Sequence, residues 1–365
     1  MKKVVHIITG LGNGGAENML YKLVTNMDSN LYDITVISLR DKGIIGKRLE
    51  EKNIEVIALN INNLKYAIKS IKKAKQICKS ATVIQSWMYH ADLFGFVIAK
   101  IFLKKKIIWG IRHGVLENGK DRRSTIIIAK INAILSRYVD EVVCCSNVSK
   151  VYHESIGYKS LKVIPNGFDI TYFENNLDDG AKLKESLCIN QNKRVLISIG
   201  RWNKAKNYPN LIKAISILSR KREDFICILV GSGLLENEEL LNLISYYEVE
   251  NYIRILGPRS DIPKVLSMGD VFVLHSDIEG FSNALGEAML SKLFCIATDV
   301  GDNEYILNDC GVLVERDNPL NLSEAIMYAL NLDEKERKYY SERAKLRIEE
   351  NFSIQRVSEE FCKLY

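Results

Sequence analysis

The chain has 365 residues, 47% hydrophobic and 26% charged, an ordinary composition for a globular protein long enough to form two domains. No apolar stretch approaches the roughly 18 residues of a membrane-spanning helix, and the N-terminal apolar run is too short for a signal peptide. The eight cysteines include no Cys-x-x-Cys pair, so we expect a cytoplasmic protein with reduced thiols and neither disulfides nor a zinc site.

Positive charge is concentrated in the first half of the chain. Residues 1–170 contain 27 Lys and Arg against 14 Asp and Glu, whereas residues 171–365 contain 24 against 31. This split predicts that the first half faces something anionic. Nucleic acid is disfavoured, because the sequence has no helix-turn-helix, zinc-finger or RNA-binding aromatic motif. An anionic membrane surface is the other candidate partner.

Alternating strands and helices are predicted through the first half. The first strand, Lys3–Thr9, runs into a turn in which Gly10, Gly12 and Gly15 satisfy G-x-G-x-x-G, and a helix follows from Ala16. Glycine allows the backbone to approach a phosphate or sugar closely, although a tight strand-to-helix turn alone would explain the pattern. Further strands are predicted at 34–39, 54–59, 82–85, 107–110, 141–145 and 161–164. This alternation predicts a parallel sheet with helices on both faces.

An amphipathic helix is predicted from Leu64 to Lys79. Ile68, Ile71 and Ala74 are expected to face the core. The outer face is basic and carries Lys69, Lys72, Lys73 and Lys75. A basic helix face is usually only solvated. Together with residues 104–106, however, this face concentrates the positive excess and is the candidate membrane-facing surface.

A domain boundary is predicted near Tyr172, where the chain becomes polar before the alternation restarts. Strands are predicted at 194–199, 225–230, 252–256, 271–274, 293–297 and 311–314. The predicted fold class is therefore α/β, with two tandem Rossmann-like, doubly wound parallel-sheet domains at residues 1–172 and 173–351 and a binding cleft between them. The C-terminal helix, about 352–365, is a candidate to pack back on the first domain.

The stretch from Asp270 to Ile296 reads as strand, polar turn, helix and strand, and it carries two carboxylates. Glu279 lies in the turn and Glu287 in the first turns of the helix. A carboxylate suits a vicinal diol of a ribose or sugar, and the N–H groups at the helix start suit a diphosphate. The plain alternative is that Glu287 complements the helix dipole and Glu279 is a solvated loop residue.

Five motifs occur in order at predicted strand ends. They are Gly14-Gly15-Ala16-Glu17, His113-Gly114, Asn166-Gly167-Phe168-Asp169, Gly200-Arg201 with Lys206-Asn207, and the Glu279/Glu287 pair inside EGFSNALGEAM. Together they resemble the retaining nucleotide-sugar glycosyltransferases of family 4, which have the GT-B architecture, and the segment SWMYHADLFG is similar to bacterial polysaccharide-assembly members. The sequence departs from the commonest family pattern at Ser291-Lys292 and Asp302-Asn303, which concerns details of the sugar pocket.

The resemblance implies a catalytic set of His113, Arg201, Lys206 and Glu279. Arg201 and Lys206 would hold the donor diphosphate and offset charge as it leaves. Glu279 would bind hydroxyls of the transferred sugar, His113 would donate a hydrogen bond to that sugar, and Glu287 would accept the ribose hydroxyls. The other expected donor contacts are Gly14, Gly15, Asn166, Gly200, Gly231, Gly233, Arg259, Gly280, Phe281, Ser282 and Asn283.

The implied reaction moves a hexosyl or N-acetylhexosaminyl unit from a nucleotide diphosphate sugar to a glycan or undecaprenyl-diphosphate-linked acceptor. It would retain the anomeric configuration, need no cofactor or metal, and occur in the cytoplasm or at the inner face of the membrane. Two alternatives remain open. G-x-G-x-x-G could mark an NAD(P)-dependent oxidoreductase, although Arg40-Asp41 is ambiguous where an acid for the ribose is expected. The chain could also bind sugar nucleotides without being an enzyme.

Overall fold

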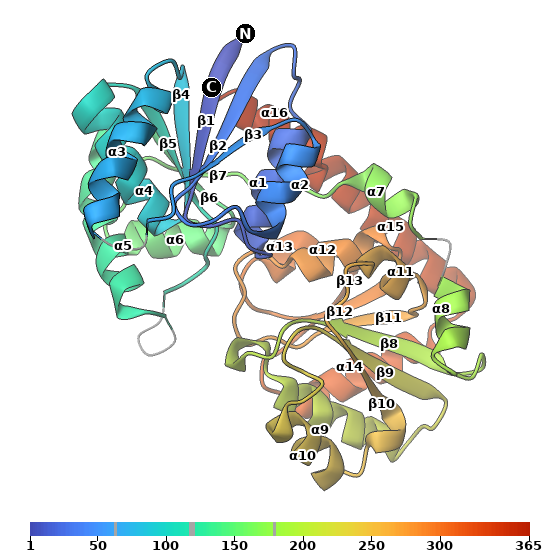
Figure 1. Ribbon diagram of the computed structural model, residues 1–365. Helices are drawn as coiled ribbons and strands as arrows, with labels where there is room; N and C mark the ends of the chain where they lie inside the picture. The colour runs from blue at the N-terminus through green and yellow to red at the C-terminus, as the bar shows by residue number, and fades with distance from the viewer. Residues whose placement is uncertain (62–63, 117–120, 178–179) are drawn as a thin grey trace. The chain divides into compact units, whose positions relative to one another are not determined.

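The computed structural model describes residues 1–61, 64–116, 121–177 and 180–365, without the side chains of residues 64–67. The chain forms two compact α/β units (Figure 1). The first unit contains Met1–Gly167 and Ile354–Tyr365, and the second contains Phe168–Ser353. Each unit holds one sheet whose strand pairs are parallel, which confirms the predicted fold class of two doubly wound domains in tandem. Among the described residues, no helix combines the length and hydropathy that a membrane span requires.

The sheet of the first unit has seven strands in the order β3-β2-β1-β4-β5-β6-β7. They are β1 (Lys2–Ile8), β2 (Tyr32–Ser38), β3 (Glu55–Ala58), β4 (Val83–Trp87), β5 (Lys106–Ile111), β6 (Glu141–Cys144) and β7 (Leu161–Val163). Every residue of β4 and all but the first residue of β5 are buried, because helices cover both faces of the sheet. The strand order reverses between β1 and β4, and open α/β sheets bind ligands at such a switch point, beyond the carboxyl ends of the strands.

Helices cover both faces of the first sheet (Figure 1). One layer contains α1 (Gly15–Thr25), α2 (Gly43–Glu51) and the C-terminal α16 (Ile354–Cys362), which packs beside α1. The opposite layer contains α3 (Leu64–Cys78), α4 (Tyr89–Phe96) with its π-helical continuation η1 (Val97–Leu103), and α5 (Arg123–Leu135). The short η2 (Ser136–Tyr138) and α6 (Asn147–Ser155) complete the unit.

One residue of α3 that was predicted to face the core lies on the surface. Ala74 is buried and Ile71 is half-buried, but Ile68 is 64% exposed. At 100° per residue, Ile68 lies about 120° around the helix from Ala74. The prediction for Ile68 was wrong because periodicity gives the direction of an apolar face but not its width.

The sheet of the second unit has six strands in the order β10-β9-β8-β11-β12-β13. They are β8 (Arg194–Ile199), β9 (Phe225–Val230), β10 (Ile253–Gly257), β11 (Val271–Leu274), β12 (Phe294–Thr298) and β13 (Gly311–Val314). The first strand of this unit, β8, pairs with β9 on one side and β11 on the other. The switch point therefore lies between β8 and β11.

Helices also cover both faces of the second sheet. α9 (Tyr208–Ser219), α10 (Glu238–Tyr246) and α14 (Pro319–Asn331) share one buried cluster with the strands. α12 (Asn283–Leu290) and the long α15 (Glu334–Phe352) pack against each other and against β12. The remaining short elements are α7 (Ile170–Glu174), α8 (Gly180–Ser186), η3 (Lys204–Lys206), η4 (Glu250–Tyr252), α11 (Ile262–Ser267) and α13 (Asn303–Leu307).

Candidate functional site

In the second unit, glycines stand where three neighbouring strands end. The Gly200 N–H donates to the Val230 carbonyl at 2.9 Å, and the Gly231 N–H donates to the Gly257 carbonyl at 2.8 Å. A Cβ at Gly231 would lie 1.9 Å from the Gly200 carbonyl oxygen, so no other residue fits there without a backbone shift. Gly233 has a φ of +73°, a conformation that favours glycine. These glycines shape the carboxyl edge of the sheet whether or not a ligand is bound.

The loop after β8 is fixed to the loop after β11. The Asn207 side-chain amide donates to Asp277 Oδ1 at 2.7 Å, and the Asp277 N–H donates to the Ala205 carbonyl at 2.8 Å. Beneath them, His275 Nε2 lies 2.9 Å from the Ser198 hydroxyl. Burial lowers the pKa of His275 to about 4, so this ring is neutral near pH 7. The two loops on either side of the switch point therefore form one ordered surface.

Lys206 and Glu279 meet on that surface. Lys206 Nζ lies 2.5 Å from Glu279 Oε1, and the Ser276 hydroxyl donates to the same oxygen at 2.7 Å. The two side chains are 23% and 11% exposed, so the pair is largely withdrawn from water. Both residues were predicted for the site, but with different partners: Lys206 with the donor diphosphate and Glu279 with hydroxyls of the transferred sugar. In the structure each is the counter-ion of the other.

Arg201 is the second predicted cation of this edge. It directly follows Gly200, its side chain is exposed, and it has no ion pair within the described ranges. A guanidinium in this position can accept a phosphate without first leaving a carboxylate. Arg259 differs, because its Nε and Nη2 donate to the two carboxylate oxygens of Asp261 at 2.8 and 2.6 Å. These bonds hold the pKa of Asp261 below its usual value.

The start of α12 faces the same edge. Ser282 caps the helix, since its hydroxyl accepts from the Leu285 N–H at 3.4 Å. Glu287 is half-buried in the second turn. The Phe281 ring is buried, 6.1 Å from Phe168 and 5.6 Å from the Phe352 ring, so only the backbone of Phe281 is available to a ligand.

α12 rests on the fully buried ring of Phe168. A Cβ at Gly286 would lie 2.1 Å from the Phe168 ring. Gly280 is held by the loop after β12, because its carbonyl accepts from the Asp302 N–H at 3.0 Å. Sequence reasoning quoted Phe168 only as part of a motif and missed Ser276; nothing in the sequence signals Ser276, since its role depends on the Glu279 carboxylate.

In the first unit, the predicted glycine turn is ordered by side chains of α1. Gly14 is the N-cap residue and Gly15 the first residue of the helix. The Asn18 amide donates to the Gly14 carbonyl and to Asn13 Oδ1, both at 2.9 Å. The Glu17 carboxylate lies over Gly14, where an added Cβ would approach it to 2.4 Å. A ligand that approached this turn would have to displace the flexible Glu17 side chain.

His113 follows β5 and is half-buried. Its Nε2 donates to the Val115 carbonyl at 3.1 Å and lies 3.6 Å from Asp121 Oδ1. The Ser149 hydroxyl donates to the His113 carbonyl at 2.7 Å, which fixes the backbone at this point. In this conformation Nε2 is already engaged, so a hydrogen bond to a sugar would require Nδ1 or release from Val115.

Asn166 is buried beside Arg112, a residue that was not predicted for the site. Arg112 Nη1 donates to the Ile164 carbonyl at 2.8 Å and approaches Asn166 Oδ1 at 3.4 Å. The guanidinium lies 5.2 Å from the ring centres of both Trp87 and Phe361, the latter from α16. Arg112 therefore supports the segment around Asn166 and the backbone leading to His113.

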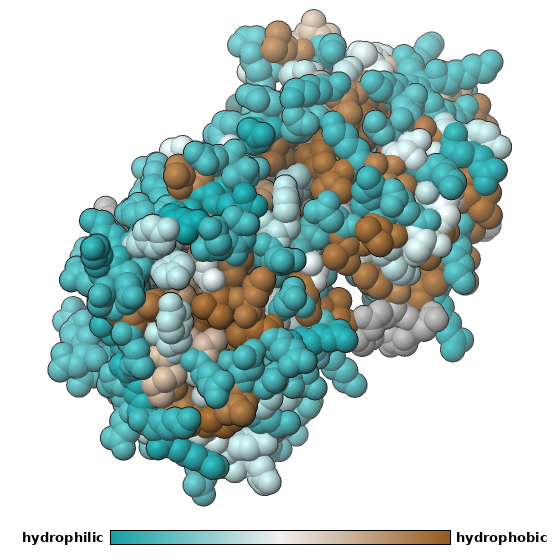
Figure 2. All heavy atoms as spheres, turned by 180° about the vertical axis from the view of Figure 1, so that it is seen from behind, coloured by the Kyte–Doolittle hydropathy of each residue, from teal (hydrophilic) through white to brown (hydrophobic). Residues whose placement is uncertain are grey.

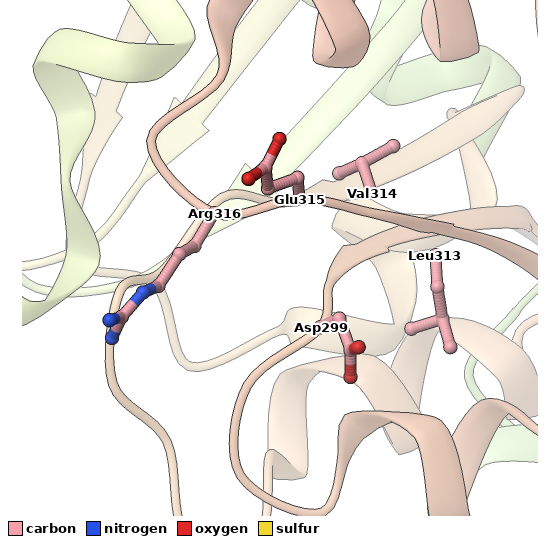
Figure 3. A pocket seen from close by; sticks show the side chains of 5 residues that line it. All are labelled: Asp299, Leu313, Val314, Glu315 and Arg316. Atoms are coloured by element: carbon pink, nitrogen blue, oxygen red, sulfur yellow. The ribbon is translucent and has the colours of Figure 1, made fainter.

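A pocket of about 390 Å³ lies beyond β12 and β13 in the second unit (Figure 3). Its lining residues are Asp299, Leu313, Val314, Glu315 and Arg316. The Glu315 and Arg316 side chains diverge from adjacent positions, as Figure 3 shows. The residues that the sequence predicted for the site are not among those that line this pocket.

Both halves of the chain match models of known glycosyltransferase families. Residues 13–172 match the family model described as Glycosyltransferase Family 4, and residues 179–347 match the one described as Glycosyl transferases group 1. A Campylobacter jejuni relative, N-acetylgalactosamine-N,N'-diacetylbacillosaminyl-diphospho-undecaprenol 4-alpha-N-acetylgalactosaminyltransferase, is 25% identical over 95% of both chains. The Escherichia coli UDP-Gal:alpha-D-GlcNAc-diphosphoundecaprenol alpha-1,3-galactosyltransferase is 23% identical over 86% of this chain and 81% of its own.

Solved structures share the fold over the whole chain. The Anabaena protein Alr3699/HepE in complex with UDP has a TM-score of 0.86 and 21% identity, covering 100% of this chain and 99% of its own. Its complex with UDP-glucose has a TM-score of 0.85 with the same identity and coverage. Since the two family models together span nearly all of a chain that folds as two doubly wound domains, the protein belongs to the family 4 glycosyltransferases of GT-B fold.

Proposed function

We propose that the protein is a retaining glycosyltransferase that moves a hexosyl or N-acetylhexosaminyl unit from a uridine diphosphate sugar to an undecaprenyl-diphosphate-linked acceptor. The names of two relatives support the acceptor, since both describe transfer to a sugar on diphospho-undecaprenol or diphosphoundecaprenol. The uridine nucleotide is supported by the UDP-galactose donor of the E. coli relative and by UDP in the Anabaena structures. The reaction would take place on the cytoplasmic side, as one step of cell-surface polysaccharide assembly.

The proposal depends most on the arrangement of Arg201, Lys206 and Glu279 beside the switch point of the second sheet. Two cations on the loop after β8 can bind a diphosphate and stabilise the charge that develops as it leaves. Glu279, held by Ser276, offers a fixed carboxylate for hydroxyls of the transferred sugar. Glu287 in α12 would accept the ribose hydroxyls.

The first unit would supply the acceptor side of the reaction. His113, once its Nε2–H is released from the Val115 carbonyl, would donate to the transferred sugar. The turn at Gly14 and Gly15 and the segment at Asn166 would lie against donor and acceptor. We propose a front-face reaction in which the leaving phosphate oxygen helps to deprotonate the acceptor hydroxyl. Because Arg201 and Lys206 place two cations on the loop after β8, they can perform the charge stabilisation for which other enzymes use a metal ion.

A ligand panel in a thermal-shift assay tests the donor. We expect stabilisation by UDP and by one or a few UDP-sugars, about 2.7 kcal/mol at 100 times the dissociation constant. Stabilisation by NADH but not by UDP would favour the oxidoreductase alternative. Slow hydrolysis of the stabilising UDP-sugar separates an enzyme from a binder, because a protein that only binds it would leave it intact.

A further inference from the structure

The helix layer formed by α3, α4–η1 and α5 exposes several large apolar side chains. Its inner side packs on the first sheet through one buried cluster, and α3, η1 and α5 carry exposed side chains on the outside, whereas every described residue of α4 is buried or half-buried. Apolar side chains on the surface gather in patches between hydrophilic ones, as the face drawn in Figure 2 illustrates. On this layer the exposed apolar residues are Ile68 (64%), Ile101 (62%), Phe102 (44%), Ile127 (57%), Ile131 (40%) and Ile134 (62%).

The isoleucines of α5 form one continuous stripe. Ile127, Ile131 and Ile134 are spaced by four and three residues, which places them on one side of the helix. The opposite side, with Ala129 and Ala133, is buried. Single exposed apolar residues are common, but a stripe of three isoleucines on one helix marks an interaction surface.

The π-helix η1 adds two adjacent apolar side chains. Ile98 and Ala99 face the core, whereas Ile101 and Phe102 are exposed just before Lys104 ends the helix with a φ of +52°. The Lys75 ammonium of α3 lies 5.4 Å from the centre of the Phe102 ring, which connects the apolar residues of η1 with the basic side of α3.

The charge on this layer is predominantly positive; Lys100 of η1 pairs at 2.7 Å with Asp140, an exposed acid that follows η2. Asp92 is the one acidic residue in the sequences of α3, α4–η1 and α5, and it is buried. The exposed basic residues in and next to these elements are Lys69, Lys72, Lys73, Lys75, Lys79, Lys104, Lys106, Arg122, Arg123, Lys130 and Arg137. We refer to these basic side chains and the six exposed apolar ones as the apolar–basic face.

We propose that the apolar–basic face binds the anionic surface of a lipid bilayer, with its isoleucines and Phe102 inserted at the headgroup boundary and its lysines and arginines on anionic headgroups. Interfacial membrane binding uses exposed apolar side chains interspersed with cations. A two-fold dimer through this face would bring like charges together and is disfavoured for that reason. The proposal rests on the proposed function in one respect: a lipid-linked acceptor would be reached from this surface.

Vesicle sedimentation tests the proposal with matched variants of the full chain. Wild type should bind vesicles of phosphatidylglycerol and phosphatidylcholine, but not phosphatidylcholine alone, and part of the binding should survive high salt. At 0.1 M salt the attraction between exposed charges is largely screened beyond about 10 Å, whereas the insertion of apolar side chains is not weakened. Ile127→Gln/Ile131→Gln/Ile134→Gln should weaken binding at least about tenfold, or 1.4 kcal/mol, and remove the salt-resistant part. Lys69→Glu/Lys72→Glu/Lys73→Glu should remove the salt-sensitive part.

A control triple substitution separates this face from general surface hydrophobicity. Leu241, Leu320 and Leu346 are exposed leucines on helices of the second unit, and changing all three to Gln should leave vesicle binding unchanged. The proposal is overturned if wild type ignores anionic vesicles at low salt, or if the isoleucine variant folds and binds them as wild type does. Wild-type dimers that the isoleucine variant lacks, without vesicle binding, would instead identify a self-interface.

A second readout distinguishes this inference from the proposed function. Transfer to a short water-soluble acceptor should be equal in wild type and in all three folded variants. If neither wild type nor any variant transfers sugar, but vesicle binding follows the expected pattern, the proposed function is wrong and the membrane-binding proposal is supported. If wild type transfers sugar normally but binds no vesicles, the proposed function is supported and the membrane-binding proposal is wrong.

Discussion

Replacing Glu279 by glutamine should change UDP binding and sugar transfer in opposite directions. The Glu279 carboxylate lies 2.5 Å from the Lys206 ammonium, so a diphosphate bound to Lys206 would have to lie close to that negative charge. Glutamine removes the charge, while its carbonyl oxygen can still accept from the Ser276 hydroxyl and from the lysine. The two loops should therefore keep their positions.

The size of the effect follows from the geometry of the pair. A phosphate oxygen about 3 Å from the other side of the ammonium would lie about 5 Å from Glu279 Oε1, where two unit charges repel by about 3 kcal/mol at an effective dielectric constant of 20. Solvent and salt reduce this repulsion, since Lys206 remains 23% exposed. We expect UDP to bind Glu279→Gln more tightly by about 1 kcal/mol, or roughly fivefold. Transfer should fall roughly ten- to hundredfold, because the sugar hydroxyls lose a charged acceptor worth about 1.5–3 kcal/mol.

Isothermal titration with UDP and initial rates with the preferred UDP-sugar measure the two effects. Glu324→Gln is the matched control, because Glu324 is an exposed carboxylate on α14 of the same unit and its loss changes the net charge equally. It should leave both quantities unchanged. If Glu279→Gln binds UDP as weakly as wild type or more weakly, the diphosphate does not meet Lys206 beside Glu279, and the assigned roles are wrong.

Further predictions concern four other residues. Glu287→Ala should lower donor affinity by roughly 1.5–3 kcal/mol in the same titration, and wild-type affinity would remove Glu287 from the site. Arg201→Ala should reduce kcat at least about tenfold, or 1.4 kcal/mol, with a smaller change in KM; an effect on KM alone would contradict a role in the transition state. Gly286→Ala should lower the free energy of unfolding by about 1–3 kcal/mol because its Cβ overlaps the ring beneath it, whereas Gly12→Ala, with open space around it, should be neutral in thermal melts. Because the pKa of His275 falls to about 4 on folding, the unfolded chain binds its proton first, and stability should drop as the pH falls from 6.5 towards 4. His275→Gln should show a smaller loss of Tm between pH 7 and pH 5, and an equal loss would remove His275 as a cause.

The strands and the loops that follow them could be predicted from the sequence because each is a local pattern. β9 and β11 are uninterrupted apolar runs, and glycines directly follow β8 and β9. Parallel sheets buried on both faces require such runs, and strand ends that approach one another require glycine. The family motifs could be assigned to strand ends because the strands that precede them were recognisable as local apolar patterns.

Contacts between distant segments could not be predicted in this way. Lys206 and Glu279 are 73 residues apart and meet only because β8 and β11 are neighbours in the sheet. The support of α12 by the Phe168 ring depends likewise on packing between segments that no local pattern connects. The exposure of Ile68 depends on how α3 packs, which its own periodicity does not determine.

The anomeric configuration of the product tests the central claim most directly. The protein is incubated with an α-linked UDP-sugar and a water-soluble sugar diphosphate acceptor, and the new linkage is examined by proton NMR. The account predicts a single product whose new linkage has the α configuration of the donor. A β-linked product, or a stabilising UDP-sugar that is neither transferred nor hydrolysed, would contradict it.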